Sequence, residues 1–108
     1  MTEQTVEQVA TAPASLTAEE VEQFKAKHDC EVVEITIDGK KAWFRSPDLR
    51  ILDAANAQKK SRDYYGVIAK NCLIAGDVDL VNRDKYFIAL MPHLDKVINP
   101  FEAQVKNL

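Results

Sequence analysis

Every second residue is apolar between positions 33 and 37, and polar residues fill the positions between them. This alternation is the period of a strand with one buried face. Asp38-Gly39 follows directly and suits a type I′ turn, in which both central residues need positive φ. We therefore predict one antiparallel β-hairpin over about residues 31–45.

The turn also fixes the register of the two strands. It places four apolar side chains on one face: Val33, Ile35, Ala42 and Phe44. Trp43 then pairs with Glu34 on the opposite face. We expect Trp43 to be exposed there, unless the N-terminal arm or the C-terminal segment covers it.

The N-terminal part of the chain divides into an arm and a first helix. Residues 1–15 contain no aromatic residue and have little to bury, so we expect a flexible arm. In "LTAEEVEQFKAKHD", Thr17 and Glu20 stand at capping-box spacing. Val21 and Phe24 supply a narrow apolar stripe, so the segment predicts a short amphipathic helix.

Two more helices are predicted after the hairpin. "SPDLRILDAANAQKK" offers Ser46 as an N-cap and Pro47 as the first helical residue. "RDYYGVIAKNCLIAG" is apolar on most sides, which is typical of a central helix, and Gly76 stands where a left-handed C-terminal cap is expected. Cys72 belongs to the apolar stripe of this helix, so we expect it to be buried with a raised pKa.

Apolar residues recur at helical spacing across positions 84–99, so this segment predicts another amphipathic helix. Pro92 lies inside it and removes a backbone donor, so a kink or a break is expected there. The last residues, "FEAQVKNL", are predicted to make a short turn of helix. That turn places Phe101, Val105 and Leu108 on one side.

The predicted fold class is α+β, with one antiparallel β-hairpin packed by four to five short helices. Because two strands alone are only marginally stable, the helices must cover the apolar face of the hairpin. Residues 1–15 form the arm, and residues 16–108 form a single α+β domain, since a chain of 108 residues has room for one core.

Composition narrows the compartment and the partners. The formal net charge is −3 and the pI is near 5.3, which gives no general attraction to nucleic acid or to anionic membranes. The start of the chain has no basic and apolar signal sequence, and no run approaches the length of a membrane span. Two distant cysteines make no disulfide framework. We expect a cytoplasmic protein without membrane contact.

Candidate catalytic and metal-binding groups are few. Asp77, Asp79 and Asp84 do not match the calcium-binding EF-hand pattern, and the histidines and cysteines do not stand at zinc-ligand spacing. His28 and Cys30 are close in sequence, but at a helix–strand junction they more plausibly end one element and start the next. We therefore expect no enzyme activity, no metal and no cofactor.

Nucleic-acid binding is an alternative that depends on a basic stretch. Residues 40–62 contain seven basic residues against two acids, and Trp43 could add one stacking ring. The seven are Lys40, Lys41, Arg45, Arg50, Lys59, Lys60 and Arg62. A solvated face that balances the acidic segments is the favoured interpretation, because the whole chain is acidic.

Contact with another protein is the favoured class of function. Tryptophan is an energetic anchor when a partner buries it, so Trp43 is a candidate partner-binding residue. Phe101, Val105 and Leu108 form a second candidate, an apolar strip suited to a groove on a partner or to docking on its own domain. The free edge of the hairpin also makes a homo-oligomer plausible.

Several local phrases resemble the small tail assembly chaperones of long-tailed bacteriophages and their prophages. The resembling stretch covers nearly everything after the arm. It runs from "LTAEEVEQFKAKHD" through "DGKKAWFRSPDLRILDAANA" and "NCLIAGD" to the end of the chain. These phrases describe architecture and include no catalytic set. The place of Pro92 in the family pattern is open.

The resemblance implies a non-enzymatic role in the host bacterial cytoplasm. Such chaperones coat the long tape-measure protein, keep it soluble, help bring tail-tube subunits to it, and are absent from the mature virion. In many phages a ribosomal frameshift also makes a longer form. Two alternatives remain open: a structural head–tail or tail component, and an accessory nucleic-acid-binding protein that uses the basic 40–62 face.

Overall fold

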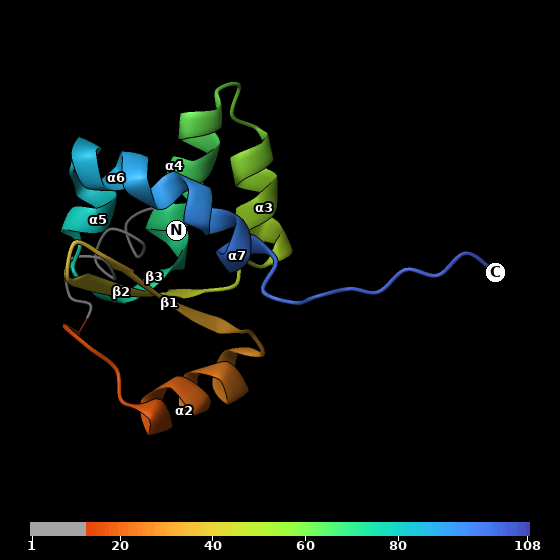
Figure 1. Cartoon of the computed structure of the whole chain (residues 1–108), viewed down its shortest axis with the longest axis horizontal. Coiled ribbons are helices and arrows are strands. Elements are labelled where there is room, and N and C mark those ends of the chain that lie inside the picture. The colour runs from red at the N-terminus through yellow and green to blue at the C-terminus, as the bar shows by residue number, and fades with distance from the viewer. Residues whose placement is uncertain (1–12) are drawn as a thin grey trace.

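A computed structural model describes residues 13–108 of the chain. Figure 1 shows a small sheet with one helix on one side and the other helices on the opposite side. The elements follow in the order α2 (Ala18–His28), β1 (Val32–Ile37), β2 (Lys40–Arg45), α3 (Leu49–Asn56), α4 (Ser61–Cys72), β3 (Leu73–Gly76), α5 (Asp79–Asn82), α6 (Asp84–Leu90), the 3₁₀ turn η1 (Met91–His93) and α7 (Leu94–Ile98). The predicted α+β class is confirmed. The arm expected over residues 1–15 falls outside the described residues, apart from its last three.

The predicted hairpin is present with the predicted register. β1 and β2 are antiparallel, with Ile35 opposite Ala42 and Val33 opposite Phe44. Asp38 and Gly39 have φ of 53° and 74°, as a type I′ turn requires. A sequence pattern of period two and a turn that needs two left-handed residues therefore define the same pairing.

The sheet has a third strand, in a segment that was predicted to be helical. α4 ends at Cys72, and Leu73 turns into an extended strand that pairs antiparallel with β2. The prediction of a helix ending in a left-handed cap at Gly76 is therefore wrong. Gly76 does have a positive φ of 105°, but it lies at the end of β3 against the backbone of Lys41 and Ala42.

A physical reason for the third strand lies in its burial. Leu73 to Ala75 are all buried, and pairing with β2 gives their backbone groups hydrogen-bond partners that water cannot supply there. The register shifts between Trp43 and Phe44, which leaves Ile74 as the extra residue of a β-bulge. β2 is thereby the central strand, and β1 and β3 are the two edges.

One face of the sheet, the inner face, carries the main core. Its large, fully buried side chains come from the sheet and from the helices that cover it: Phe44, Ile68, Leu73, Leu80, Leu90, Leu94 and Val97. Helices α3 to α7 lie on this side of the sheet (Figure 1). The side chains that the hairpin pattern assigned to the core face, Ile35, Ala42 and Phe44, all belong to this cluster.

The start of α3 differs from the prediction. Its N-cap is Asp48, whose carboxylate accepts a hydrogen bond from the Ile51 amide at 2.9 Å. Ser46 was expected in that place, but its hydroxyl accepts from the Glu31 amide at 2.9 Å, and its own amide donates to the Glu31 carbonyl at 2.8 Å. Ser46 thus extends the hairpin by one more pair, and the next acceptor along the chain caps the helix.

The break expected at Pro92 is confirmed. α6 passes into the 3₁₀ turn η1, with Pro92 at its centre, before α7 begins at Leu94. The short helical turn predicted for the last residues is wrong, because the segment 101–108 has no regular secondary structure. In Figure 1 it extends away from the body, where no neighbouring element supports a helix of so few residues.

Candidate partner-binding surfaces

Trp43 lies on the face of the sheet opposite the main core, as predicted, but it is not exposed. Only 7% of its surface is accessible, and it forms a separate small cluster with Ile74 and Ala75. We call these three residues the outer cluster and their side of the sheet the outer face. The exposed anchor expected at Trp43 is therefore a wrong prediction.

The cover over the outer cluster is helix α2 together with Leu16 just before it. Leu16, Val21 and Phe24 pack against the cluster, together with Val32 of β1. α2 was predicted as a short helix with a narrow apolar stripe, and that stripe is the part in contact with Trp43. The capping box is present: Thr17 Oγ1 accepts from the Glu20 amide at 3.1 Å, and the Glu20 carboxylate accepts from the Thr17 amide at 2.8 Å.

The polar contacts of α2 are local. Lys25 forms ion pairs with Glu22 and with Glu31, at 3.7 and 3.2 Å, and Asp29 ends the helix in a left-handed conformation with φ of 50°. Among the described residues, the hydrogen bonds and ion pairs of α2 all join partners between positions 17 and 31. Apolar side-chain packing therefore holds this helix on the sheet, together with the Lys25–Glu31 ion pair, because Glu31 is hydrogen-bonded to Ser46 at the end of the hairpin.

The second predicted surface is exposed. Phe101, Val105 and Leu108, which we call the C-terminal strip, have accessible fractions of 66%, 90% and 111%. Docking of this strip on its own domain was the alternative to partner contact, and it is absent here. Leu49 on α3 and Ile88 on α6 are also exposed, but each stands alone on its own helix, which is ordinary for a protein surface.

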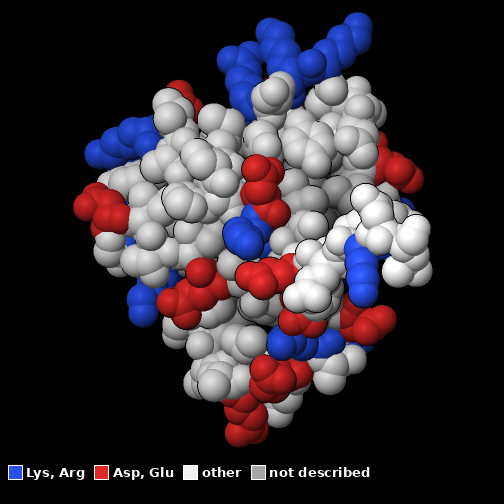
Figure 2. All heavy atoms as spheres, turned by 45° about the vertical axis from the view of Figure 1, so that its right-hand side comes forward, with Lys and Arg blue, Asp and Glu red and all other residues white. Residues whose placement is uncertain are grey.

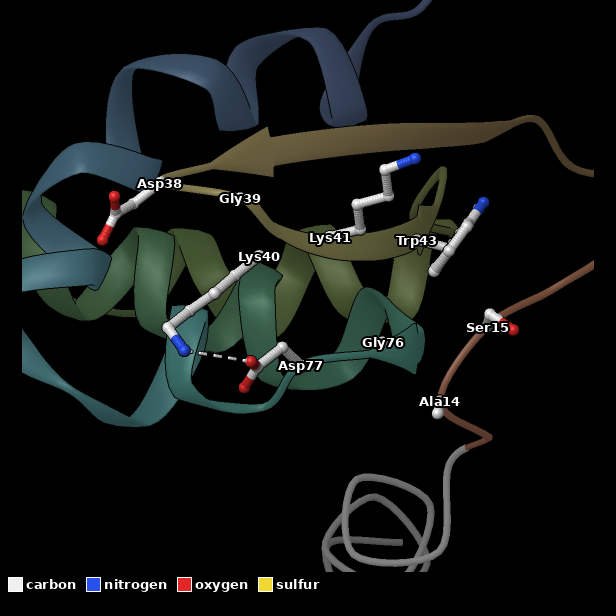
Figure 3. A pocket seen from close by; sticks show the side chains of 9 residues that line it. All are labelled: Ala14, Ser15, Asp38, Gly39, Lys40, Lys41, Trp43, Gly76 and Asp77. Carbon is white, nitrogen blue, oxygen red and sulfur yellow. Dashed lines mark hydrogen bonds and ion pairs between the residues drawn. The ribbon is translucent and has the colours of Figure 1, made fainter.

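An open hollow lies at the edge of the outer face, between the hairpin turn and the segment before α2 (Figure 3). Its wall includes Ala14, Ser15 and one side of Trp43. On the far side, Lys40 Nζ lies 3.4 Å from Asp77 Oδ2, and this carboxylate raises the pKa of Lys40. The ammonium group of Lys40 is thus paired with a carboxylate of its own chain.

The basic residues of 40–62 do not make one groove with a stacking ring, because Trp43 is covered and most of the cations have local partners. Lys41 pairs with Glu34, and Arg62 with Asp63. Figure 2 shows basic side chains gathered at the end of the molecule where α3 meets α4. Lys59 and Lys60 belong to that turn and are exposed.

The groups considered for covalent chemistry lack the surroundings that activate them. Cys72 is fully buried, and burial raises its pKa to about 12. Burial is also the main cause that raises the pKa of Cys30. The His28 ring lies 4.2 Å from the Phe24 ring, centroid to centroid, and burial, followed by the charges of Arg45 and Lys27, lowers its pKa. A nucleophilic cysteine needs a lowered pKa and access, and neither thiol has both.

Among residues 13–108, no group of three or more histidine, cysteine or acidic side chains is placed to hold a metal ion. No helix in the same range is long and apolar enough to cross a membrane.

The fold brings together residues that were not predicted to be in contact. Trp43 was identified from the hairpin register, but Ile74 was assigned to a helix, and Phe24 was not connected to either. The signal was available in part. Val21 and Phe24 are too few to cover a large core, which indicates a small apolar partner surface for α2. The C-terminal strip remains separate from this group.

Comparison of the chain with protein-family models, with curated proteins and with solved structures finds no match.

Proposed function

We propose that this protein is a non-enzymatic tail assembly chaperone of a long-tailed bacteriophage or prophage, which binds the tape-measure protein and helps recruit tail-tube subunits. The family comes from the resemblance of the sequence phrases. The observation that supports a binding role is the C-terminal strip, three large apolar side chains held in water on an extended segment.

The spacing of the strip fits a helical client. Phe101, Val105 and Leu108 stand at i, i+4 and i+7, which would place them on one face if the segment became helical. In this structure the segment is extended, so we expect it to become helical when the surface of a partner buries the face that carries these three side chains. Folding on contact lowers affinity for a given buried area, but it allows release, which a temporary coat requires.

The rest of the structure is consistent with the same role. Cys72 is buried in the core, and the outer cluster and the C-terminal strip are two groups of apolar residues that lie outside the core. A long tape-measure chain with apolar helices is held by such surfaces, because association through helices uses i, i+3, i+4 and i+7 anchors. We place the protein in the host cytoplasm and outside the mature virion. A homo-oligomer through the edge strand β1 is part of the proposal.

Co-expression tests this function. The tape-measure protein encoded beside this chain is produced with the wild-type chain, with Phe101→Asp, or with the matched control Gln104→Asp. The control adds the same charge to the same exposed segment without removing an apolar side chain. We expect Phe101→Asp to reduce the tape-measure protein recovered in solution by about tenfold, which corresponds to about 1.4 kcal/mol of contact energy. Gln104→Asp is expected to match wild type. Equal recovery with all three chains contradicts the proposal.

Two measurements separate the alternatives. An accessory nucleic-acid binder that uses the basic 40–62 face loses affinity steeply between about 50 and 200 mM salt, whereas apolar contact with a tape-measure protein does not. A structural head–tail component remains in purified particles, whereas an assembly chaperone is absent from them. Detection of the chain in mature virions therefore replaces the chaperone proposal with the structural one.

A further inference from the structure

The outer face is covered by a helix that buries none of its own residues. Trp43 is 7% exposed and Ala75 is fully buried, yet every residue of α2 retains at least partial exposure. Figure 1 shows α2 alone on its side of the sheet, away from the other helices. The helix therefore shields the outer cluster from water, while every residue of the helix remains at least partly exposed.

We propose that α2 is a removable cover, and that the outer face beneath it is a docking site for the apolar stripe of a helix from a partner polypeptide. The chemistry of the partner follows from the present occupant. The face accepts an amphipathic helix with two large apolar side chains three residues apart, as Val21 and Phe24 are. A partner helix of this kind takes the place of α2 over Trp43.

Removal of α2 from the sheet is inexpensive in free energy. Among residues 13–108, its hydrogen bonds and ion pairs join partners between positions 17 and 31, and of these only the Lys25–Glu31 ion pair reaches a residue that is hydrogen-bonded to the hairpin. Its departure gives up the packing of half-buried Leu16, Val21 and Phe24 against the outer cluster. Such weakly buried elements open locally at far lower free energy than the whole domain.

The main core does not depend on this cover. The inner face is buried by a separate cluster that includes Phe44, Leu73 and Leu94, and no residue of α2 belongs to it. Both ends of the α2 segment also stay attached to the sheet. The Pro13 carbonyl accepts from the Gly76 amide at 2.8 Å, and Asp29 leads directly toward β1. α2 therefore swings aside on two short tethers and stays attached to the domain.

The charges around Trp43 favour an acidic helix. Lys41 and Arg45 occupy outward positions on β2 on either side of Trp43, and Glu34 opposes Trp43 on β1. α2 itself has Glu19 and Glu20 in its first turn and Lys25 and Lys27 in its last turn. Because Lys41 lies 3.7 Å from Glu34, the charge of Arg45 is the one left for an acidic residue beside the apolar stripe of a partner helix, and such a pair raises the rate of association and the specificity more than the affinity.

This inference rests on the proposed function only for the class of partner, a client with apolar helices. The docking face is distinct from the C-terminal strip, which lies on a separate extended segment. The two surfaces can therefore be disabled one at a time, and a failure of one leaves the other measurable.

Trp43 is the single tryptophan of the chain, so its fluorescence reports directly on the outer face. The probe is an 18-residue acidic peptide of Ala, Glu and Lys with Leu, Phe and Leu at positions i, i+3 and i+7. A second peptide replaces those three residues by Ala. Each is titrated into the full-length wild type, Phe24→Asp and Ala26→Asp. Ala26 is an exposed residue of the same helix, so its variant adds the same charge without touching the outer cluster.

We expect Phe24→Asp to bind the Leu-Phe-Leu peptide at least about tenfold more tightly than wild type, because an open site no longer loses affinity to its own cover. Ala26→Asp is expected to match wild type, and the Ala peptide to bind none of them. The free Phe24→Asp chain is also expected to show red-shifted Trp43 emission and stronger quenching by acrylamide. Phe101→Asp, which disables the other surface, is expected to bind as wild type does.

Equal affinity of wild type and Phe24→Asp, or no binding to either, overturns the inference. A wild type that elutes as a dimer by exchanging α2 between copies also overturns it, because the occupant is then a second copy of the chain. If Phe24→Asp loses the circular dichroism of the folded chain, Phe24→Ala provides the same comparison. A tape-measure protein that stays insoluble in co-expression contradicts the proposed function and leaves these results unchanged.

Discussion

The two faces of the sheet share the same three strands but differ in how their side chains are buried. On the inner face, Phe44 and Leu73 are fully buried among residues from helices α3 to α7. On the outer face, Trp43 is covered mainly by one helix, α2, whose own residues all keep some exposure, and by Leu16 just before that helix. The inner face is thus buried by contacts that depend on one another, while the outer face depends on one element that can leave alone. We therefore expect the inner face to supply most of the stability of the domain, and we propose that the outer face binds a partner.

The largest expected contrast comes from one phenylalanine on each side. Phe44→Ala empties a fully buried site and is expected to cost about 3–5 kcal/mol of unfolding free energy. Phe24→Ala trims a half-buried ring above the outer face and is expected to cost about 1 kcal/mol or less, because much of its area already meets water. Urea unfolding followed by circular dichroism measures both. Equal losses would mean that α2 belongs to the cooperative core.

Substitutions of two glycines test the close approach of β3 to β2. In Gly76→Ala the new methyl group meets the backbone of Lys41 and Ala42, at a φ that side chains rarely adopt. We expect a loss of about 2 kcal/mol or more, with the pairing of β2 and β3 disturbed. Gly66→Ala on α4 has open space at the same atom and is expected to gain up to about 1 kcal/mol. Thermal unfolding gives the sign of each change, and a tolerated Gly76→Ala would refute the tight strand approach.

The two cysteines allow a similar comparison, with smaller expected losses of stability. Cys72→Ser places a hydroxyl among apolar side chains of the inner core and is expected to cost about 1–3 kcal/mol. Cys30→Ser, at a half-buried site, is the control and is expected to cost less. A thiol reagent at pH 8 should label Cys30 before Cys72. Rapid labelling of Cys72 in the folded chain would identify a reactive centre and contradict the binding role.

Cys72 also predicts a loss of stability in alkali. Its pKa rises from 9.0 to about 12 on folding because burial disfavours the thiolate. Between these values the unfolded chain releases the proton and the folded chain retains it, so rising pH favours unfolding. Urea midpoints of wild type and Cys72→Ala, measured from pH 8 upward, should therefore converge as pH increases. Parallel curves would contradict a buried thiol.

The smallest expected effect concerns the outer face and pH. His28 packs on Phe24, and burial, then Arg45 and Lys27, lower its pKa below the ordinary 6.5. A group whose pKa falls on docking takes up its proton more readily when undocked, so docking is strongest above 6.5 and weakens as pH falls below it. Acrylamide quenching of Trp43 should therefore increase slightly from pH 7.5 to 5.5. His28→Gln removes the titrating group and should flatten this profile.

The inner face was the more predictable of the two. Period-two alternation and the Asp38-Gly39 turn each determine which residues of β1 and β2 point inward, so Val33, Ile35 and Phe44 were assigned correctly. Cys72 was also assigned correctly, because its helical stripe is apolar along its whole length. These features depend on local periodicity, which the sequence displays directly.

The outer face was harder to predict because it is made by contacts distant in sequence. The run Leu73 to Ala75 suits a buried helix and a buried strand equally, since a short apolar segment has no diagnostic period. Its pairing with β2 decided between them. Trp43 was expected to be exposed because a narrow apolar stripe on a helix does not indicate which surface the helix packs against. The strand at Leu73 to Ala75 and the burial of Trp43 therefore both depend on tertiary contacts, which local sequence patterns do not show.

Hydrogen exchange of the full-length wild type, followed by mass spectrometry, tests the difference between the faces most directly. We expect amides of α2 to exchange at least about tenfold faster than those of β2 and α4, through local opening that leaves the inner core closed. Exchange of α2, β2 and α4 at one common rate, set by unfolding of the whole domain, would show that α2 does not open separately from the core and is not a removable cover.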